Sequence, residues 1–270
     1  MPNSTASYTL TQVRDLFRAP VWHPEDHPQL PQVVASGRKP DVQACGVCHR
    51  ADGPGGPENS SLAGLPGAYI IQQMADFKSG ARTTSVPQRV PPKLMIGLAK
   101  SATDAEIQAA AEYFSALKPK TNIKIVETDT VPKSYVAGWH LAAVTNGEKE
   151  PIDERIIEVP DDLEHFVSRD SRVRFTAYAP IGSVEKGRAL AASGSEGRVA
   201  CSVCHGPELR GIGPIPGIAG RSPSYIVRQL YDFKYSARAG AMAALMKPSV
   251  EKLTVADMLS LAAYAASLPP

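Results

Sequence analysis

The chain has 270 residues, with 43% hydrophobic residues, 29 basic and 27 acidic side chains and a net charge of +2. That balance argues against a nucleic-acid partner, because proteins that bind nucleic acids carry a basic surplus. No apolar run reaches the roughly eighteen residues that a membrane-spanning helix needs, so no transmembrane segment is predicted. The length suits two domains of ordinary size.

Residues 1–40 are predicted to be an N-terminal extension with little helix. The segment Met1–Leu10 is polar and has no apolar region of the kind found in an export signal. Pro24, Pro28 and Pro31 interrupt the stretch before the first cysteine. Proline inside a helix removes a hydrogen bond and clashes with the preceding turn, so any helix here should be short.

Residues 41–119 are predicted to form a first helical domain. The stretch 69–78 places its apolar residues on one helical face, and Gly80 follows as a stop signal. Thr103 and Glu106 have the spacing of a capping box, which predicts the start of another helix.

Residues 120–182 are predicted to be a linker that packs across both flanking domains, because structureless loops of this length are uncommon in compact chains. The segment is not of low complexity and contains Trp139. Its stretch Ile156–Val159, followed by Pro160, is typical of a short extended segment. Residues 148–164 carry 8 acidic and 2 basic side chains, which indicates either a solvated acidic loop or a docking surface.

Residues 183–270 are predicted to form a second helical domain. Ser183 can cap the helix that leads toward Cys201. Thr254 and Asp257 form a weaker version of the earlier capping box and predict the last helix.

The two domains repeat one pattern. Cys45 matches Cys201 and Tyr69 matches Tyr225, both at an offset of 156 residues. Further along, Tyr113 matches Tyr264 at an offset of 151. The second copy is therefore five residues shorter in the intervening loop, and a duplicated domain is indicated.

All four cysteines lie in two C-x-x-C-H motifs, the attachment signature of haem c. Two thiols three positions apart can bond both vinyl groups of one porphyrin, and the adjacent histidine can ligate its iron. A zinc site would not need a histidine beside both pairs, and a thioredoxin-like redox pair would not be duplicated with its histidine. The residues predicted to hold two covalent haem c groups are Cys45, Cys48, His49, Cys201, Cys204 and His205.

The predicted sixth iron ligands are methionines. Met95 and Met246 stand at equivalent positions, each eight residues before the threonine that opens the last helix of its domain. A thioether ligand raises the reduction potential. Met242 is the alternative to Met246, whereas Met74 and Met258 align with apolar residues of the other repeat and are assigned to the core.

Four further histidines have no counterpart in the other repeat: His23, His27, His140 and His165. Local structural roles are predicted for them, and ligation of iron by two histidines is the alternative that they leave open.

Together these motifs resemble the class I cytochromes c, specifically the tandem dihaem cytochrome c4 family. In that family, a helix led by tyrosine ends in F-K-x-G-x-R. Phe77–Arg82 fits this pattern, and Phe233–Arg238 fits it except that Ser236 replaces the glycine. The resemblance implies an all-α fold of two class I cytochrome c domains in tandem, here joined by a long irregular linker.

The resemblance covers residues 41–119 and 181–270. It also implies that the Pro216 carbonyl holds the His205 ring through its free N–H, a bond that fixes the orientation of an iron ligand. Ser60 takes the place of that proline in the first repeat.

The predicted function is that of a periplasmic electron carrier, because two six-coordinate irons leave no open position for substrate. The expected partners are redox proteins: a dehydrogenase or quinol-oxidising complex as donor, and a terminal oxidase or reductase as acceptor. The alternative is a dedicated electron-transfer subunit of a periplasmic oxidoreductase complex. Covalent haem is attached in an oxidising compartment, so an export signal is expected to have been removed. Residues 185–270 carry 10 basic and 6 acidic side chains, which favours an acidic partner at that end.

Overall fold

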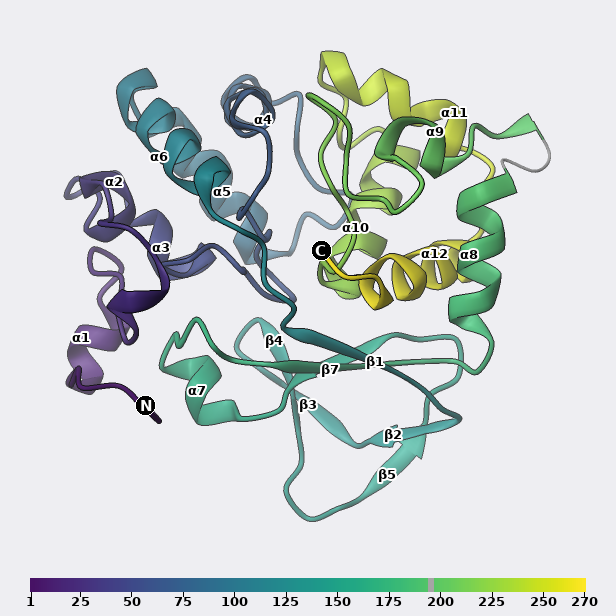
Figure 1. Ribbon diagram of the computed structural model, residues 1–270, viewed down its shortest axis with the longest axis horizontal. Helices are drawn as coiled ribbons and strands as arrows, with labels where there is room; N and C mark the ends of the chain where they lie inside the picture. Colours follow the sequence, from purple (N-terminus) through teal and green to yellow (C-terminus); the bar gives the residue numbers. More distant parts are fainter. Residues whose placement is uncertain (194–196) are drawn as a thin grey trace.

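The computed structural model describes residues 1–193 and 197–270. Two groups of helices lie side by side, with small sheets on one side of both (Figure 1). The first lobe contains α1 (Leu10–Arg14), the 3₁₀ helix η1 (Pro24–Asp26), α2 (Gln32–Ala35), α3 (Cys45–His49), α4 (Gly67–Ser79), α5 (Val90–Ser101) and α6 (Asp104–Ala116). The second lobe contains α8 (Ser183–Ser193), α9 (Cys201–His205), α10 (Pro223–Lys234), the 3₁₀ helix η3 (Ala241–Met246), α11 (Lys247–Val250) and α12 (Val255–Ser267).

The helix ends follow the local chemistry of the sequence. Gly80 ends α4 in the left-handed conformation, with φ of 83°, which glycine adopts without steric cost. The predicted capping box of α6 is present, since the Thr103 side chain accepts from the Glu106 N–H and the Glu106 carboxylate accepts from the Thr103 N–H. Thr254 opens α12 in the same way.

One predicted helix start is wrong by one residue. Ser183 is already the first residue of α8, and the Gly182 carbonyl accepts a hydrogen bond from the Lys186 N–H. The glycine therefore occupies the capping position that the sequence suggested for Ser183. In the N-terminal extension, the expected short helices are found as η1 and α2.

The linker is more regular than the sequence indicated. It contains β1 (Ile123–Glu127), β2 (Thr130–Pro132), β3 (Ser134–Ala137), β4 (His140–Ala143), β5 (Lys149–Pro151), β6 (Ile157–Pro160), α7 (Leu163–Val167) and β7 (Phe175–Ala179). The strand order is β1-β7-β6, with β1 parallel and β6 antiparallel to β7. Strands β2–β5 and β3–β4 form two further antiparallel pairs. The predicted extended segment is β6.

The linker segment contacts both lobes. Phe166 and Phe175 lie over the first lobe at Gly56, where an added Cβ would stand 3.8 and 3.5 Å from the two rings. On the second lobe, the buried Glu158 of β6 accepts hydrogen bonds from the Ser222 hydroxyl at 2.7 Å and from the Ser224 N–H at 3.1 Å. Glu158 thereby accepts a hydrogen bond from a backbone N–H of the first turn of α10.

Each lobe has its own hydrophobic core. Phe114 of α6 is fully buried in the first, and Met258 of α12 is 1% exposed in the second. In the second lobe α8 crosses α12 closely at Gly187, where an added Cβ would lie 2.0 Å from the Ser260 carbonyl oxygen. Only a residue without a side chain permits this approach.

Candidate haem sites

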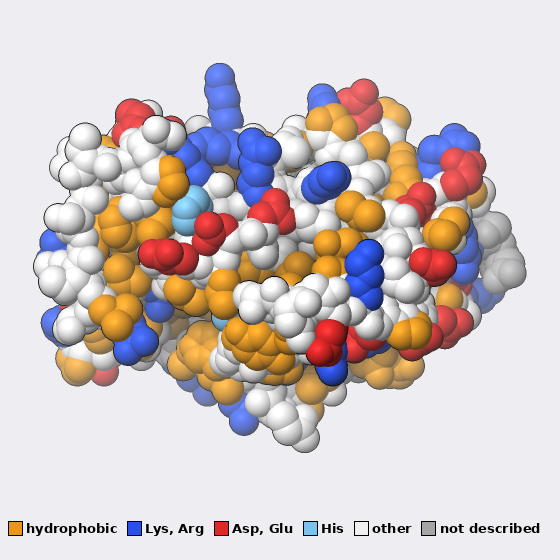
Figure 2. Space-filling model, turned by 90° about the horizontal axis from the view of Figure 1, so that it is seen from below, with side chains coloured by type: hydrophobic (Ala, Val, Ile, Leu, Met, Phe, Trp, Pro, Cys, Tyr) orange, Lys and Arg blue, Asp and Glu red, His pale blue; other side chains and the backbone are white. Residues whose placement is uncertain are grey.

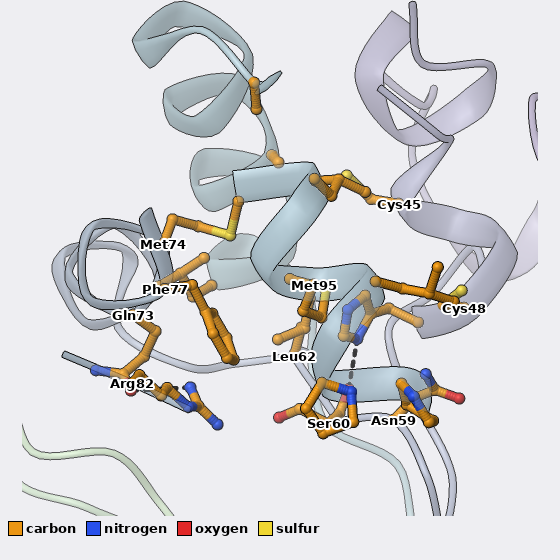
Figure 3. Close-up of a pocket in the computed structure, with 18 of the residues that line it drawn as sticks. Cys45, Cys48, Asn59, Ser60, Leu62, Gln73, Met74, Phe77, Arg82 and Met95 are labelled. Carbon is orange, nitrogen blue, oxygen red and sulfur yellow. Dashed lines mark hydrogen bonds between the residues drawn. The ribbon is translucent and has the colours of Figure 1, made fainter. Parts of the chain in front are cut away.

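A cavity in the first lobe brings together all the predicted haem-binding residues of the first motif and its methionine. Cys45, Cys48 and His49 come from the short helix α3, and Met95 comes from α5. Figure 3 shows Met95 between the two cysteines and the side chains of Phe77 and Arg82. A thiol pair, an imidazole and a thioether therefore line one cavity.

The orientation of His49 suits iron ligation. Its Nδ1–H donates to the Ser60 carbonyl at 2.8 Å (Figure 3), which leaves Nε2 as the unprotonated nitrogen. Burial lowers the pKa of His49 against the opposing effect of this hydrogen bond. The imidazole is thus held neutral, which is the form that binds a metal.

The second lobe repeats the arrangement. Cys201, Cys204 and His205 line a cavity together with Met246. The His205 Nδ1–H donates to the Pro216 carbonyl at 2.8 Å, which confirms the bond implied by the resemblance. Burial again lowers the pKa of the imidazole.

The methionines differ in their surroundings. Met242 and Met246 both line the second cavity, but Met242 is 49% exposed whereas Met246 packs against the hydrophobic core. Met258 lies in the core, as predicted. Met74 packs against the first core but also lines the first cavity, a position that its alignment with leucine did not reveal.

The four remaining histidines take local roles. His23 and His165 flank the buried Asp170, with N–O distances of 3.2 and 3.6 Å. His140 packs on Phe166 with ring centroids 4.2 Å apart. None of these four histidines is among the described residues that line the two cavities. They are His23, His27, His140 and His165.

A buried polar network separates the two cavities, and the sequence motifs did not single it out. The Arg82 guanidinium donates to Gln73 and Gln229 at 2.9 Å each and to the Tyr225 hydroxyl at 2.9 Å. Arg238 donates to the same two glutamines at 2.6 and 3.0 Å. The signal was present, since each of these residue types recurs at the offset of 156.

Three guanidinium groups gather at this boundary, where the buried Asp232 raises the pKa of Arg82 through space without forming an ion pair with it. Arg82 and Arg238 are 7% and 8% exposed, and Arg221 donates to the carbonyls of Gly217 and Ser61. Burial lowers the pKa of Arg221 to about 10. Within residues 1–193 and 197–270, none of the three guanidinium groups forms an ion pair with a carboxylate. Buried charges of this kind need an anionic partner.

The donor sets and the unpaired cations together fit a haem in each cavity. Haem supplies vinyl groups for two thiols, an iron for an imidazole and a thioether, and two carboxylates for buried guanidinium groups. A site for a bare metal ion is not suggested, since the described residues contain no cluster of three histidine, cysteine or carboxylate side chains placed to hold one.

Comparison with known proteins gives the same picture. Cytochrome c-552 of Acidithiobacillus ferridurans is 37% identical over 226 residues, which cover 83% of this chain and 73% of that protein. The thiosulfate dehydrogenase electron acceptor of Thiomonas intermedia is 29% identical over 85% of this chain and 81% of its own length. Reduced cytochrome c4 from Pseudomonas stutzeri matches the fold with a TM-score of 0.53 and 23% identity, over 83% of this chain and 93% of that one. No protein-family model matches the chain.

The fold, the duplicated cavities and these relatives define a dihaem c-type cytochrome, an electron carrier with two covalently bound haem c groups. Its all-α core of two tandem class I domains is the predicted fold class, confirmed by the structural neighbours. The chain belongs to the family of dihaem cytochromes that includes cytochrome c4. No helix in the described part of the chain is long and apolar enough to cross a membrane.

Proposed function

We propose that residues 41–119 and 183–270 are the two haem domains, with residues 1–40 as an extension and residues 120–182 as the linker. In the first domain Cys45 and Cys48 bond the haem, and His49 and Met95 ligate its iron. In the second, the corresponding set is Cys201, Cys204, His205 and Met246. The observation that carries the proposal is that each cavity is lined by one complete set.

The buried arginines are proposed to hold the propionates of both haems. Arg82 lines both cavities, whereas Arg221 and Arg238 line the second. Propionate carboxylates supply ion-pair partners for these guanidinium groups, and hydrogen bonds between charged groups are stronger than neutral ones. The same residues exclude water from the boundary between the haem sites.

When bound, each haem supplies reversible one-electron chemistry at its iron. The protein fixes the imidazoles through Ser60 and Pro216, supplies thioether ligands that favour the ferrous state, and surrounds the groups with apolar side chains. The electron donor is proposed to be a periplasmic dehydrogenase that oxidises a reduced sulfur compound, since one relative is named as the electron acceptor of thiosulfate dehydrogenase. A terminal oxidase or reductase is the acceptor.

Mass and redox measurements on the exported protein test this function. The intact denatured chain should exceed the mass of its amino acids by about 1.2 kDa, the mass of two haems bonded covalently. A reductive titration should consume two electrons per chain. Loss of the colour into acid acetone, or a single electron per chain, would contradict the proposal.

A separate experiment tests the donor. Stopped-flow mixing of the oxidised cytochrome with thiosulfate dehydrogenase and thiosulfate should reduce the haems, and omission of either component should leave them oxidised. If a quinol-oxidising complex reduced the haems and thiosulfate dehydrogenase did not, the carrier function would stand and the proposed donor would be wrong.

A further inference from the structure

The two haem-attachment motifs differ in exposure although they are equivalent in sequence. Val47 of the first motif is 0% exposed, and its counterpart Val203 is 67% exposed. The loop after the first motif, residues 51–57, is buried throughout, whereas most of the matching residues 207–213 are exposed. The difference must therefore come from what packs on each motif.

The first motif is covered by the chain's own extension and linker. The Arg169 guanidinium, which follows α7, donates to the Val47 carbonyl at 2.7 Å. Gly46 faces Ala19 of the extension so closely that an added Cβ would lie 2.8 Å from the Ala19 Cβ. The polypeptide around the first haem attachment is thus closed to another protein.

An aromatic pair completes this cover. Phe166 and Phe175 of the linker lie over Gly56. The residue equivalent to Gly56 in the second repeat is Ile212, which is 56% exposed. Its side chain extends over the end of the second motif, 3.4 Å from the position of a Cβ on Gly206. One repeat therefore has an apolar cover at this position, and the other presents an apolar side chain to solvent.

We propose that Val203, Cys204 and Ile212, named here the second haem face, form the surface on which redox proteins dock. The partner presents an uncharged, apolar patch that contains aromatic side chains, because side chains of that chemistry occupy the equivalent surface of the first repeat. The inference rests on the proposed electron-carrier function and adds the place where electrons enter and leave.

Part of the basic charge that favoured an acidic partner lies away from the second haem face. Arg210 beside the face is neutralised by Glu208 at 3.1 Å. Of the basic residues counted in this domain, Arg221, Arg228 and Arg238 bond groups of the first lobe and do not form a surface field. Seen from the linker side, the molecule mixes acidic, basic and hydrophobic side chains (Figure 2). Redox encounters commonly use small interfaces, which such a face can supply.

Voltammetry on gold tests the proposal with a defined probe, a methyl-terminated alkanethiol monolayer. The wild-type holoprotein should exchange electrons faster on this surface than on a carboxylate-terminated one. Val203→Glu and Ile212→Glu should each slow exchange by about tenfold, because a charge must be desolvated at the contact. Val203→Leu should retain the wild-type rate.

Val136→Glu is the matched control. Val136 is 71% exposed on β3 of the linker, away from the second motif in sequence, and its substitution should leave the rate unchanged. Equal rates for wild type, Val203→Glu and Ile212→Glu would overturn the proposal. A loss of rate confined to Val136→Glu, or faster exchange on the carboxylate surface, would also overturn it. A solution titration of the same proteins, consuming two electrons per chain, separates these outcomes from failure of the carrier function.

Discussion

Arg82 and Arg238 pair backbone to backbone in an isolated antiparallel bridge between the two lobes, at positions that are equivalent in the two repeats. On either side, the Thr83 N–H donates to the Ala237 carbonyl and the Ala239 N–H donates to the Ala81 carbonyl. The repeats thus meet through matching residues in a local twofold arrangement. Side chains that shape one haem cavity also hold the other lobe in place.

The unequal distribution of arginines predicts two different reduction potentials, with the second haem the higher. Arg82, Arg221 and Arg238 line the second cavity, whereas Arg82 and the Glu58-paired Arg89 line the first. Nearby positive charge favours the ferrous state, and a unit charge at roughly 8 Å contributes about 2 kcal/mol at an effective dielectric constant of 20. A potentiometric titration should therefore resolve two one-electron waves.

Substitution of Arg221 identifies which of the two one-electron waves belongs to the second haem. Arg221→Leu should lower the upper potential by several tens of millivolts, whereas Arg221→Lys keeps the charge and should lower it less. Arg210→Leu is the control, because Arg210 is exposed and already paired with Glu208. A titration with two equal potentials in the wild type would contradict the assignment.

Replacement of each proposed methionine ligand should open one haem. Met95→Ala and Met246→Ala should each bind about one equivalent of carbon monoxide when reduced, since an iron that loses its sixth ligand gains an open position. Each should also lose about half of the near-red band that methionine-ligated ferric haem shows. Visible spectroscopy measures both effects.

Met242→Ala and Met74→Leu are the matched controls for the methionine variants. Met242 and Met74 line the second and first cavities respectively, so each control removes a thioether from the same cavity as a proposed ligand. Both controls should remain closed to carbon monoxide. Binding by Met242→Ala together with a closed Met246→Ala would transfer the ligand role to Met242.

Glu158 predicts a pH-dependent stability. Burial raises the pKa of its carboxyl, although the hydrogen bonds that it accepts from Ser222 and Ser224 act to lower that pKa. The folded state therefore binds the proton more tightly than the unfolded chain. The contribution of this proton to the free energy of unfolding is complete below the unfolded pKa and is lost as the pH rises through the folded pKa. Glu158→Gln should raise the urea midpoint at pH 7 and leave it unchanged near pH 4. An equal effect at both pH values would show that charge is not the cause.

Gly187 predicts a steric effect on stability. Gly187→Ala should cost about 1–3 kcal/mol of unfolding free energy, because its Cβ would collide with the Ser260 carbonyl of α12. Gly97→Ala is the control, since Gly97 lies within α5 with no atom within 4 Å of an added Cβ. Alanine there should be neutral or stabilising by about 0.5–1 kcal/mol. Urea unfolding of the holoprotein measures both.

The sequence was sufficient for features that depend on a few neighbouring residues. The capping box of Thr103, the stop at Gly80 and the extended stretch in β6 each follow from local chemistry, and the structure contains all three. Internal repetition added longer-range information, because it matched Met95 with Met246 across the chain. The prediction that these two methionines ligate iron remains to be tested.

Contacts between distant segments could not be predicted from the sequence. Net charge suggested a basic second domain, but the burial of Arg238 and the bond of Arg221 to the Ser61 carbonyl could be seen only once both lobes were assembled. The linker's strands are short, and some pair with strands far away in sequence, as β1 does with β7. Alternation of apolar and polar residues alone could therefore not identify them. Phe166 and Phe175 carry no motif, and their role depends on where the linker folds back.

The cover over Val47 sets an order for maturation. Cys45 and Cys48 are only partly exposed in the folded chain, and burial raises the pKa of the Cys45 thiol to about 12, which suppresses the reactive thiolate. The enzyme that forms the thioethers must reach these sulfurs before Arg169 closes over the motif from the linker. Arg169 follows Val47 by 122 residues, so the linker part of the cover depends on a segment far along the chain from the motif. The second motif carries no such requirement, because Cys204 is exposed in the folded chain.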